Sequence, residues 1–214
     1  MNIALGSTLP CADGPVRELA DVVVDAAGRR VTHVVVQPKR HHEAARLVPL
    51  DLLAENASGL LLCCTADALD RLEPVREYAY LPAGTRPEEG GDWSIGVEDV
   101  LVAPSFEPLD AAEPELDPNV NLMYDRVPKG EVELRLTSSV YSADEHHVGS
   151  VHGVEVGEGG AIAVLTLLRG HLWWRREISV PTDAIAAFEN DLVTLAVEKR
   201  ALKRFPSRRA RDPS

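Results

Sequence analysis

The stretch Leu47-Val48-Pro49-Leu50-Asp51 recurs in altered form as Ser179-Val180-Pro181-Thr182-Asp183. It lies within a longer internal similarity, in which residues 15–74 align without a gap on residues 147–206. The matched positions are mostly apolar or turn-forming, and they include Val22/Val154, Val24/Val156, Gly28/Gly160, Val35/Leu167, Leu60/Leu192 and Pro74/Pro206. Two copies that keep such positions but change their surfaces are expected to share a scaffold rather than a reaction.

Short strand patterns alternate with turn signals in the first copy. Residues 16–24 and 31–36 flank Asp25-Ala26-Ala27-Gly28, which predicts a β-hairpin. We expect further strands at residues 45–48 and 60–64, a helical turn at 49–53, and a short helix that follows Thr65 as its N-cap. Short strands joined by tight turns predict a small antiparallel β-barrel.

The second copy repeats this pattern. We expect strands, a helical turn and a terminal helix in this order: strands 131–136, 148–156, 162–168 and 171–180, the turn 183–188, strand 192–197 and the helix 198–204. The predicted fold class is therefore mainly β, with two tandem small antiparallel barrels, short helical turns and a short C-terminal helix.

The middle of the chain differs in kind, since residues 75–130 carry twelve acidic and four basic residues and are rich in proline. Residues 94–97 and 100–102 are candidate short strands, whereas 106–121 is typical of an extended linker. The predicted organisation is a first repeat at 1–80, an acidic insert at 81–130, a second repeat at 131–206 and a basic tail at 207–214.

Composition restricts the class of protein. The formal net charge of -12 argues against electrostatic binding of nucleic acid by the protein as a whole. Cys11, Cys63 and Cys64 have neither metal-site spacing nor an even disulfide set, and we expect Cys63 and Cys64 to be buried strand residues. The N-terminus has no signal-peptide pattern, and no stretch has the length of a membrane span, so we expect a cytoplasmic protein.

The pair formed by Val31-Thr32-His33-Val34-Val35-Val36 and Leu47-Val48-Pro49-Leu50-Asp51 resembles the PRC-barrel superfamily. That family includes the barrel of the photosynthetic reaction-centre H subunit and the C-terminal domain of the ribosome-maturation factor RimM. The second copy carries the same layout in 163–168 and 180–183, so the resemblance covers about 1–80 and 131–206. It implies the barrel fold and a role in binding and assembly, without implying catalytic residues.

Trp173-Trp174-Arg175-Arg176 is the strongest candidate for a binding site. Because neighbouring strand side chains point to opposite faces, we expect one tryptophan in the core and the other outside beside the arginines. Trp and Arg are enriched at the residues that dominate protein interfaces. An ordinary strand that contributes to core and surface is the alternative interpretation.

The basic segment 198–214 holds seven basic and two acidic residues. It could contact RNA, an anionic membrane surface or the acidic middle of the chain, or remain solvated.

Motifs for catalysis are missing from the sequence. His41-His42 and His146-His147, with Glu43 and Asp144-Glu145 nearby, are potential metal ligands, but surface loop histidines are the simpler interpretation. No nucleophile motif, phosphate-binding loop or dinucleotide fingerprint occurs, so we expect no catalytic residues and no cofactor.

The sequence thus favours a non-enzymatic binding or scaffold protein that contacts a protein partner or a second copy of itself. A ribosome- or RNA-associated factor is the alternative.

Overall fold

The computed structural model describes residues 1–39, 44–82, 93–97, 119–170 and 175–210, with side chains described outside 76–126. The chain is mainly β, as predicted, and most strand pairs are antiparallel. The strands of the N-terminal half are β1 (Asn2–Ala4), β2 (Thr8–Pro10), β3 (Val16–Asp25), β4 (Arg30–Gln37), β5 (Arg46–Pro49), β6 (Leu53–Asn56) and β7 (Gly59–Leu62). Those of the C-terminal half are β11 (Glu131–Leu134), β12 (Ser139–Tyr141), β13 (His147–Val156), β14 (Ile162–Arg169), β15 (Arg176–Pro181), β16 (Ile185–Glu189), β17 (Leu192–Leu195) and β18 (Ser207–Arg209).

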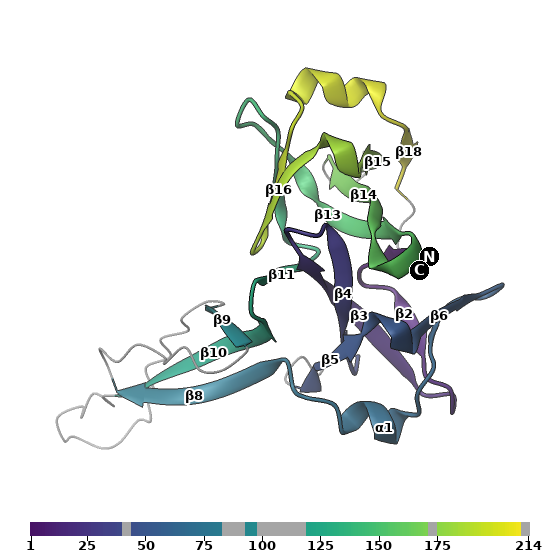
Figure 1. Ribbon diagram of the computed structural model, residues 1–214, viewed down its shortest axis with the longest axis vertical. Helices are drawn as coiled ribbons and strands as arrows, with labels where there is room; N and C mark the ends of the chain where they lie inside the picture. The colour runs from purple at the N-terminus through teal and green to yellow at the C-terminus, as the bar shows by residue number, and fades with distance from the viewer. Residues whose placement is uncertain (40–43, 83–92, 98–118, 171–174, 211–214) are drawn as a thin grey trace, which may run out of the picture.

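The two halves follow one order of elements (Figure 1). In each, a long hairpin (β3–β4 or β13–β14) is followed by a third strand, a 3-10 turn, two short strands and a terminal helix. The 3-10 turns are η2 (Leu50–Leu52) and η5 (Thr182–Ala184), each begun after the proline of the repeated motif. The terminal helices are α1 (Ala66–Asp70) and the 3-10 helix η6 (Lys199–Arg204), and a further 3-10 turn, η3 (Glu158–Gly160), closes the second hairpin.

Aspartates outside the two terminal helices accept hydrogen bonds at their N-termini. Asp13 Oδ1 lies 3.1 Å from the Ala66 N–H at the start of α1, and Asp144 Oδ1 lies 2.9 Å from the Lys199 N–H at the start of η6. Thr65 caps α1 as predicted, since its hydroxyl accepts from the Ala68 N–H at 3.2 Å. Each aspartate follows the short strand β2 or β12, so it ties the terminal helix of its half to the start of that half.

The first strands of the two halves are exchanged. Strand β11, at the start of the second half, pairs with β3 of the first, with Leu134 opposite Val22. Reciprocally, β1 pairs with β13 of the second half, with Ile3 opposite Val154. Each long hairpin is therefore completed by a strand that belongs to the other half.

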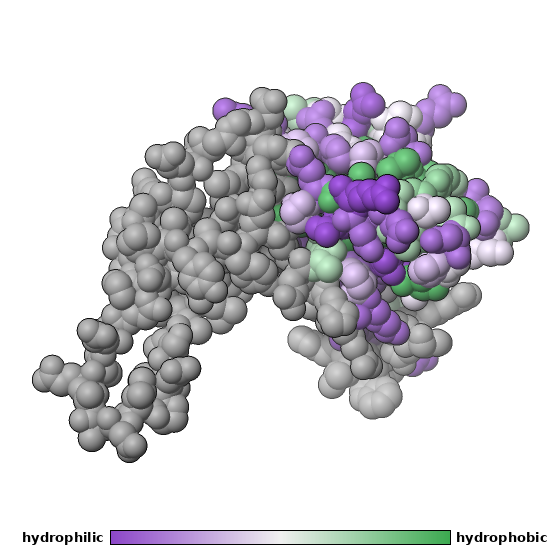
Figure 2. Space-filling model, turned by 90° about the horizontal axis from the view of Figure 1, so that it is seen from below, coloured by the Kyte–Doolittle hydropathy of each residue, from purple (hydrophilic) through white to green (hydrophobic). Residues whose placement is uncertain are grey.

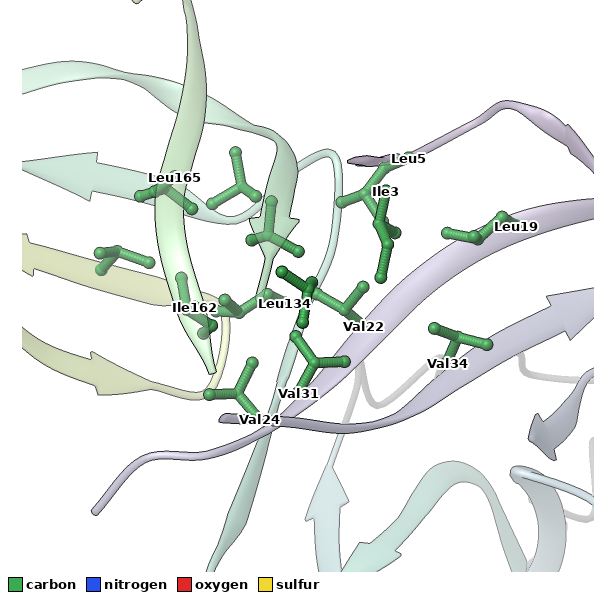
Figure 3. Close-up of a cluster of buried hydrophobic side chains, with 14 of the residues drawn as sticks. Ile3, Leu5, Leu19, Val22, Val24, Val31, Val34, Leu134, Ile162 and Leu165 are labelled. Carbon is green, nitrogen blue, oxygen red and sulfur yellow. The ribbon is translucent and has the colours of Figure 1, made fainter. Parts of the chain in front are cut away.

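The exchange joins the two halves in one large hydrophobic core, and a smaller separate cluster of buried residues is formed by Val23, Val35, Ala45, Leu47, Val75 and Val127. Figure 3 shows Leu134 between Ile162 and Leu165 on one side and Val22 and Val31 on the other. Ile3 and Leu134 are fully buried, and a single cluster of buried side chains includes residues from both halves. Valine and leucine supply most of this core, in keeping with the β-branched strands read from the sequence.

The hairpin turns reinforce the junction between the halves. The Arg29 guanidinium donates to the Thr182 carbonyl at 2.9 Å, which links the first hairpin to η5. Gly160, in the second hairpin turn, has a φ of +82°, and a Cβ there would lie 2.4 Å from the Val31 carbonyl oxygen. Only glycine fits this close approach.

The middle of the chain forms a third unit of structure. Strands β8 (Arg76–Pro82), β10 (Asn119–Pro128) and β9 (Trp93–Val97) make a three-stranded antiparallel sheet in that order. In Figure 1 this sheet extends away from the rest of the molecule. The predicted strand at 94–97 is confirmed, but residues 119–121 are strand rather than linker, and the candidate strand at 100–102 lies outside the described residues.

Several predicted segments need correction. Residues 185–188 form strand β16 rather than a helical turn, because the turn closes after three residues and the apolar Ile185 and Phe188 continue in strand conformation into the core. Strand β7 ends at Leu62, so Cys63 is exposed and Cys64 half-buried rather than both being buried. Residues 207–209 are not a free tail but strand β18, paired with β15.

Candidate functional site

Of the predicted binding residues, Arg176 begins β15 (Arg176–Pro181) and Arg175 precedes it. Trp173 and Trp174 lie outside the described residues, so the prediction that one of them enters the core stays a prediction. Arg175 and Arg176 are described, and both are exposed. The strand predicted over 171–180 is observed only as Arg176–Pro181.

The pairing of β15 with β18 brings two separately predicted segments together. Arg176 lies opposite Arg209 and Glu177 opposite Arg208, while the Ala210 N–H donates to the Arg175 carbonyl at 3.0 Å. The arginines that follow the tryptophans and those of the basic C-terminal segment thus lie on neighbouring segments of one sheet. The sequence contained both segments but no signal for their pairing.

A further arginine joins this surface from β14. Arg169 lies opposite Arg176, so Arg169, Arg176 and Arg209 form a row across three adjacent strands, which we call the arginine row. Residues directly opposite in neighbouring strands have side chains on the same face, about 4.5–5.5 Å apart at Cβ. The row therefore concentrates positive charge at one end of the sheet.

The other face of the same strands holds a buried carboxylate. Glu177 is 6% exposed, and its Oε2 accepts from Arg208 Nε at 2.5 Å while its Oε1 lies 3.6 Å from His152 Nε2. Because a buried carboxylate requires a partner, this network ties β18 to β15 and β13. Glu177 follows Arg176 in an extended strand and points to the opposite face, so it does not neutralise the arginine row.

The predicted histidine candidates have ordinary structural surroundings where they are described. His146 Nδ1 lies 3.2 Å from Asp144 Oδ2, and the His147 ring packs edge-on against Tyr141 with centroids 5.4 Å apart. Hydrogen bonds from the Ser142 side chain and the Lys199 backbone N–H lower the pKa of Asp144 to about 2. His41-His42 lies outside the described residues, and the described residues contain no group of three or more His, Cys, Asp and Glu side chains suited to a metal ion.

Two of the three cysteines, Cys11 and Cys64, do not have the lowered pKa of an activated nucleophile. Burial is the main cause that raises the pKa of both Cys11 and Cys64, and a raised pKa leaves less thiolate at neutral pH. The neighbouring Arg17 guanidinium lowers the pKa of Cys11 in part, without reversing the direction.

A second ionic network, which is partly buried, stabilises the fold. Arg135 donates to Glu133 Oε2 at 2.5 Å and to Asp191 Oδ2 at 2.7 Å, and the Ser138 hydroxyl lies 3.1 Å from Asp191 Oδ1. These contacts join the exchanged strand β11 to the turn between β16 and β17. They give the charged residues beside the core a structural role.

The exposed apolar side chains of the described residues do not define a stronger candidate for a binding site. Figure 2 shows hydrophilic and hydrophobic residues interspersed over the described part of one face. The large hydrophobic side chains that are exposed among the described residues are Val16, Leu136 and Tyr141. Charge, rather than hydrophobicity, therefore distinguishes the surface at β14, β15 and β18.

No protein-family model and no curated protein matches this chain. Within its described residues, the protein has no helix with the length and apolar character needed to cross a membrane. The function must therefore be argued from the site itself.

Proposed function

We propose that this chain is a cytoplasmic, non-enzymatic binding or scaffold protein, built from two interlocked PRC-type barrels, that contacts a protein partner through the β15–β18 surface. One observation carries the proposal. The β15–β18 pairing joins Arg175 and Arg176, which follow two tryptophans in the sequence, to Arg208 and Arg209. Tryptophan and arginine are the residue types most often found at the centre of protein interfaces.

The similarity of the two halves supports a scaffold role. They share the order of their elements and exchange their first strands, yet their surfaces differ. A scaffold kept twice with divergent surfaces is suited to presenting distinct contacts, since the core positions can stay constant while exposed positions change. Among the described residues, the polar clusters serve pairing between strands and lack a nucleophile with an adjacent base.

A pull-down with the full chain as bait tests the proposal. We expect the Trp174→Ala/Arg175→Ala double variant to lose a partner that the wild type retains, because the contact is placed on these residues. Arg71→Ala is a suitable control, since Arg71 is an exposed arginine at the end of α1 in the other half. Equal capture by the double variant and the wild type would contradict the proposal.

The alternative function is a ribosome- or RNA-associated factor similar to the RimM barrel. The exposed basic residues of η6 and β18 favour it, because Lys203, Arg204 and Arg208 lie close together in the sequence and are all exposed. Electrostatic contact with phosphates is strongest at low salt. Absence of binding to single-stranded and duplex RNA at low ionic strength would eliminate this alternative.

Self-association is the remaining form of protein contact. Light scattering coupled to size-exclusion chromatography distinguishes a monomer from a homodimer, and a chain that ends at Pro206 removes β18 for comparison. A dimer that requires β18 would identify the partner at this surface as a second copy of the chain.

A further inference from the structure

Two of the three cysteines lie side by side where the start of the first half meets its end. Cys11 follows β2, and Cys64 lies two residues after β7. The Ala12 N–H donates to the Cys64 carbonyl at 3.0 Å, so the backbones of the two cysteines are neighbours on adjacent segments. Neighbouring extended segments lie about 4.8 Å apart. This spacing falls within the separation of roughly 4.4–6.8 Å between Cα atoms that a disulfide requires.

The side chains of the two cysteines pack against the same hydrophobic core. Cys11 is 5% exposed and belongs to the large core, and Cys64 is half-buried and packs against it. Burial is the main cause that raises the pKa of Cys11, and the neighbouring Cys64 raises it further, while Arg17 lowers it in part. Both cysteines are free thiols. The backbone contact and the shared core thus place the two thiols side by side.

The scaffold does not require cysteine at either position. In the second half, the Ala143 N–H donates to the Val197 carbonyl at 3.0 Å, which is the equivalent backbone contact. Ser142 is the buried residue before this donor, in the place of Cys11. Val197 packs against the core in the place of Cys64. The second half contains no cysteine, so the fold forms this junction without thiols and their presence in the first half calls for a chemical explanation.

We propose that Cys11 and Cys64 are a site of reversible oxidation, at which hydrogen peroxide converts the two thiols to an intramolecular disulfide. The peroxide oxidises the Cys64 thiol, which is the less buried of the two, to a sulfenic acid and is itself reduced to water. The Cys11 sulfur then attacks the Cys64 sulfur, the S–O bond breaks, and the hydroxyl group leaves with the Cys11 proton as a second water. Two electrons pass from the sulfurs to the peroxide, so the reaction balances without a cofactor.

The disulfide joins the start of the first half to its terminal helix. Cys64 precedes Thr65, the cap of α1, and Asp13 accepts from the Ala66 N–H at the same end of the helix. A bond between Cys11 and Cys64 closes a loop around most of the first half, and it therefore restricts the unfolded chain more than the folded one. We expect oxidation to stabilise this half. The inference is independent of the proposed function, because it uses no residue of the β15–β18 surface.

Peptide mapping by mass spectrometry tests the inference on the full chain. The reduced protein is treated with hydrogen peroxide at pH 8.5, because burial raises the pKa of both Cys11 and Cys64 and leaves little thiolate at pH 7. We expect one pair of peptides linked through these two cysteines, which dithiothreitol separates. We also expect the melting temperature of the oxidised chain to lie about 5 °C or more above that of the reduced chain.

The second half supplies the substitutions for matched variants. Cys11→Ser and Cys64→Val introduce the residue types that the second half has at these positions, and each should abolish the linked peptides and the shift in melting temperature. Cys63→Ser removes the exposed thiol and should leave both results unchanged. If Cys11→Ser does not fold, Cys64→Val, at a half-buried position, decides the test.

Three results would overturn the inference. The first is a disulfide through Cys63, within one chain or between two chains, in place of the Cys11–Cys64 bond. The second is oxidation of single cysteines to sulfenic or sulfinic acid without linked peptides. The third is a Cys11–Cys64 bond that forms only after urea is added, because the folded protein would then hold the two thiols apart.

Discussion

The two halves of the molecule have the same order of elements as far as the end of the terminal helix, and they differ after it. After α1, Val75 pairs beside β5 through its N–H to the Ala45 carbonyl at 3.1 Å, and the chain continues into β8 of the middle sheet. After η6, the equivalent segment stays beside β15 as β18. In the first half, the segment after the terminal helix thus leads into another sheet. In the second half, the equivalent segment forms a sheet edge that carries arginines.

This difference distinguishes the features of the shared scaffold from the features of the surface. The exchanged strands, the helical turns after proline and the aspartates at the terminal helices occur in both halves. The arginine row and the buried Glu177 occur in the second half alone, since Ala45 aligns with Glu177. Features present in both halves are explained by folding, so features of one half are the better guide to function.

The largest expected effect concerns the exchanged strands. Ile3→Ala and Leu134→Ala each empty a fully buried site on a strand that completes the other half, and each should lower the free energy of unfolding by about 2–5 kcal/mol. Urea denaturation followed by fluorescence and circular dichroism measures this. Leu136→Ala, at a side chain 39% exposed, is the control and should cost about 0.5 kcal/mol or less.

The same experiment tests whether the two halves depend equally on their exchanged strands. Because the core is shared, we expect one cooperative transition in the wild type and in both variants. Two separate transitions, or a loss in Leu134→Ala without one in Ile3→Ala, would show that the halves are not interlocked in the way their strand pairing indicates.

A smaller effect is expected from the ionic network that only the second half contains. Asp191→Asn keeps the shape and tolerates the φ of 57° at this position, but it removes the Asp191 carboxylate from Arg135. We expect a loss of about 1 kcal/mol in unfolding free energy, because Asp191 is 46% exposed and solvent screens the pair. Thermal denaturation at low and high salt measures it, and a loss that does not shrink with salt would contradict an electrostatic cause.

The aspartate at η6 predicts a dependence on pH. The pKa of Asp144 is lowered from 3.8 to about 2, so its carboxylate stabilises the folded state fully above about pH 3.8, and this contribution is lost as the pH falls through about 2. The melting temperature of Asp144→Asn should therefore lie below that of the wild type at pH 5 and approach it near pH 2. A constant difference across this range would exclude the titration of Asp144 as its source.

The smallest expected effect concerns the alkylation rates of the three cysteines, all of which lie in the first half. Cys63 is exposed and Cys11 is buried with a raised pKa, so alkylation of the folded protein at pH 7 should modify Cys63 first and Cys11 last, with rates at least about tenfold apart. Peptide mass spectrometry after timed iodoacetamide treatment measures the order. In urea, as the control, all three cysteines should be alkylated at equal rates. Equal alkylation rates in the folded protein as well would contradict the burial of Cys11.

The predicted elements succeeded where local patterns were strong. Val31–Val36, flanked by a turn signal, falls within β4, and Thr65 caps α1 as its residue type indicated. The predictions failed where tertiary contacts decided the outcome, since Ile185–Phe188 and Ser207–Arg209 become strands only because a neighbouring strand is available to pair with them. For the site, Arg175 and Arg176 were named from composition, whereas Arg169 was not, because its position opposite Arg176 depends on register.

The sequence by itself determined the mainly β class, the hairpins and the repeated corner, because hydrophobic alternation, turn residues and proline act over a few neighbouring residues. Only the tertiary structure decided the exchange of β1 and β11, the large core shared by the two halves and the alignment of Arg169, Arg176 and Arg209. These features depend on which distant strands pair and in what register. That choice is made by burial of the whole core, which no local pattern encodes.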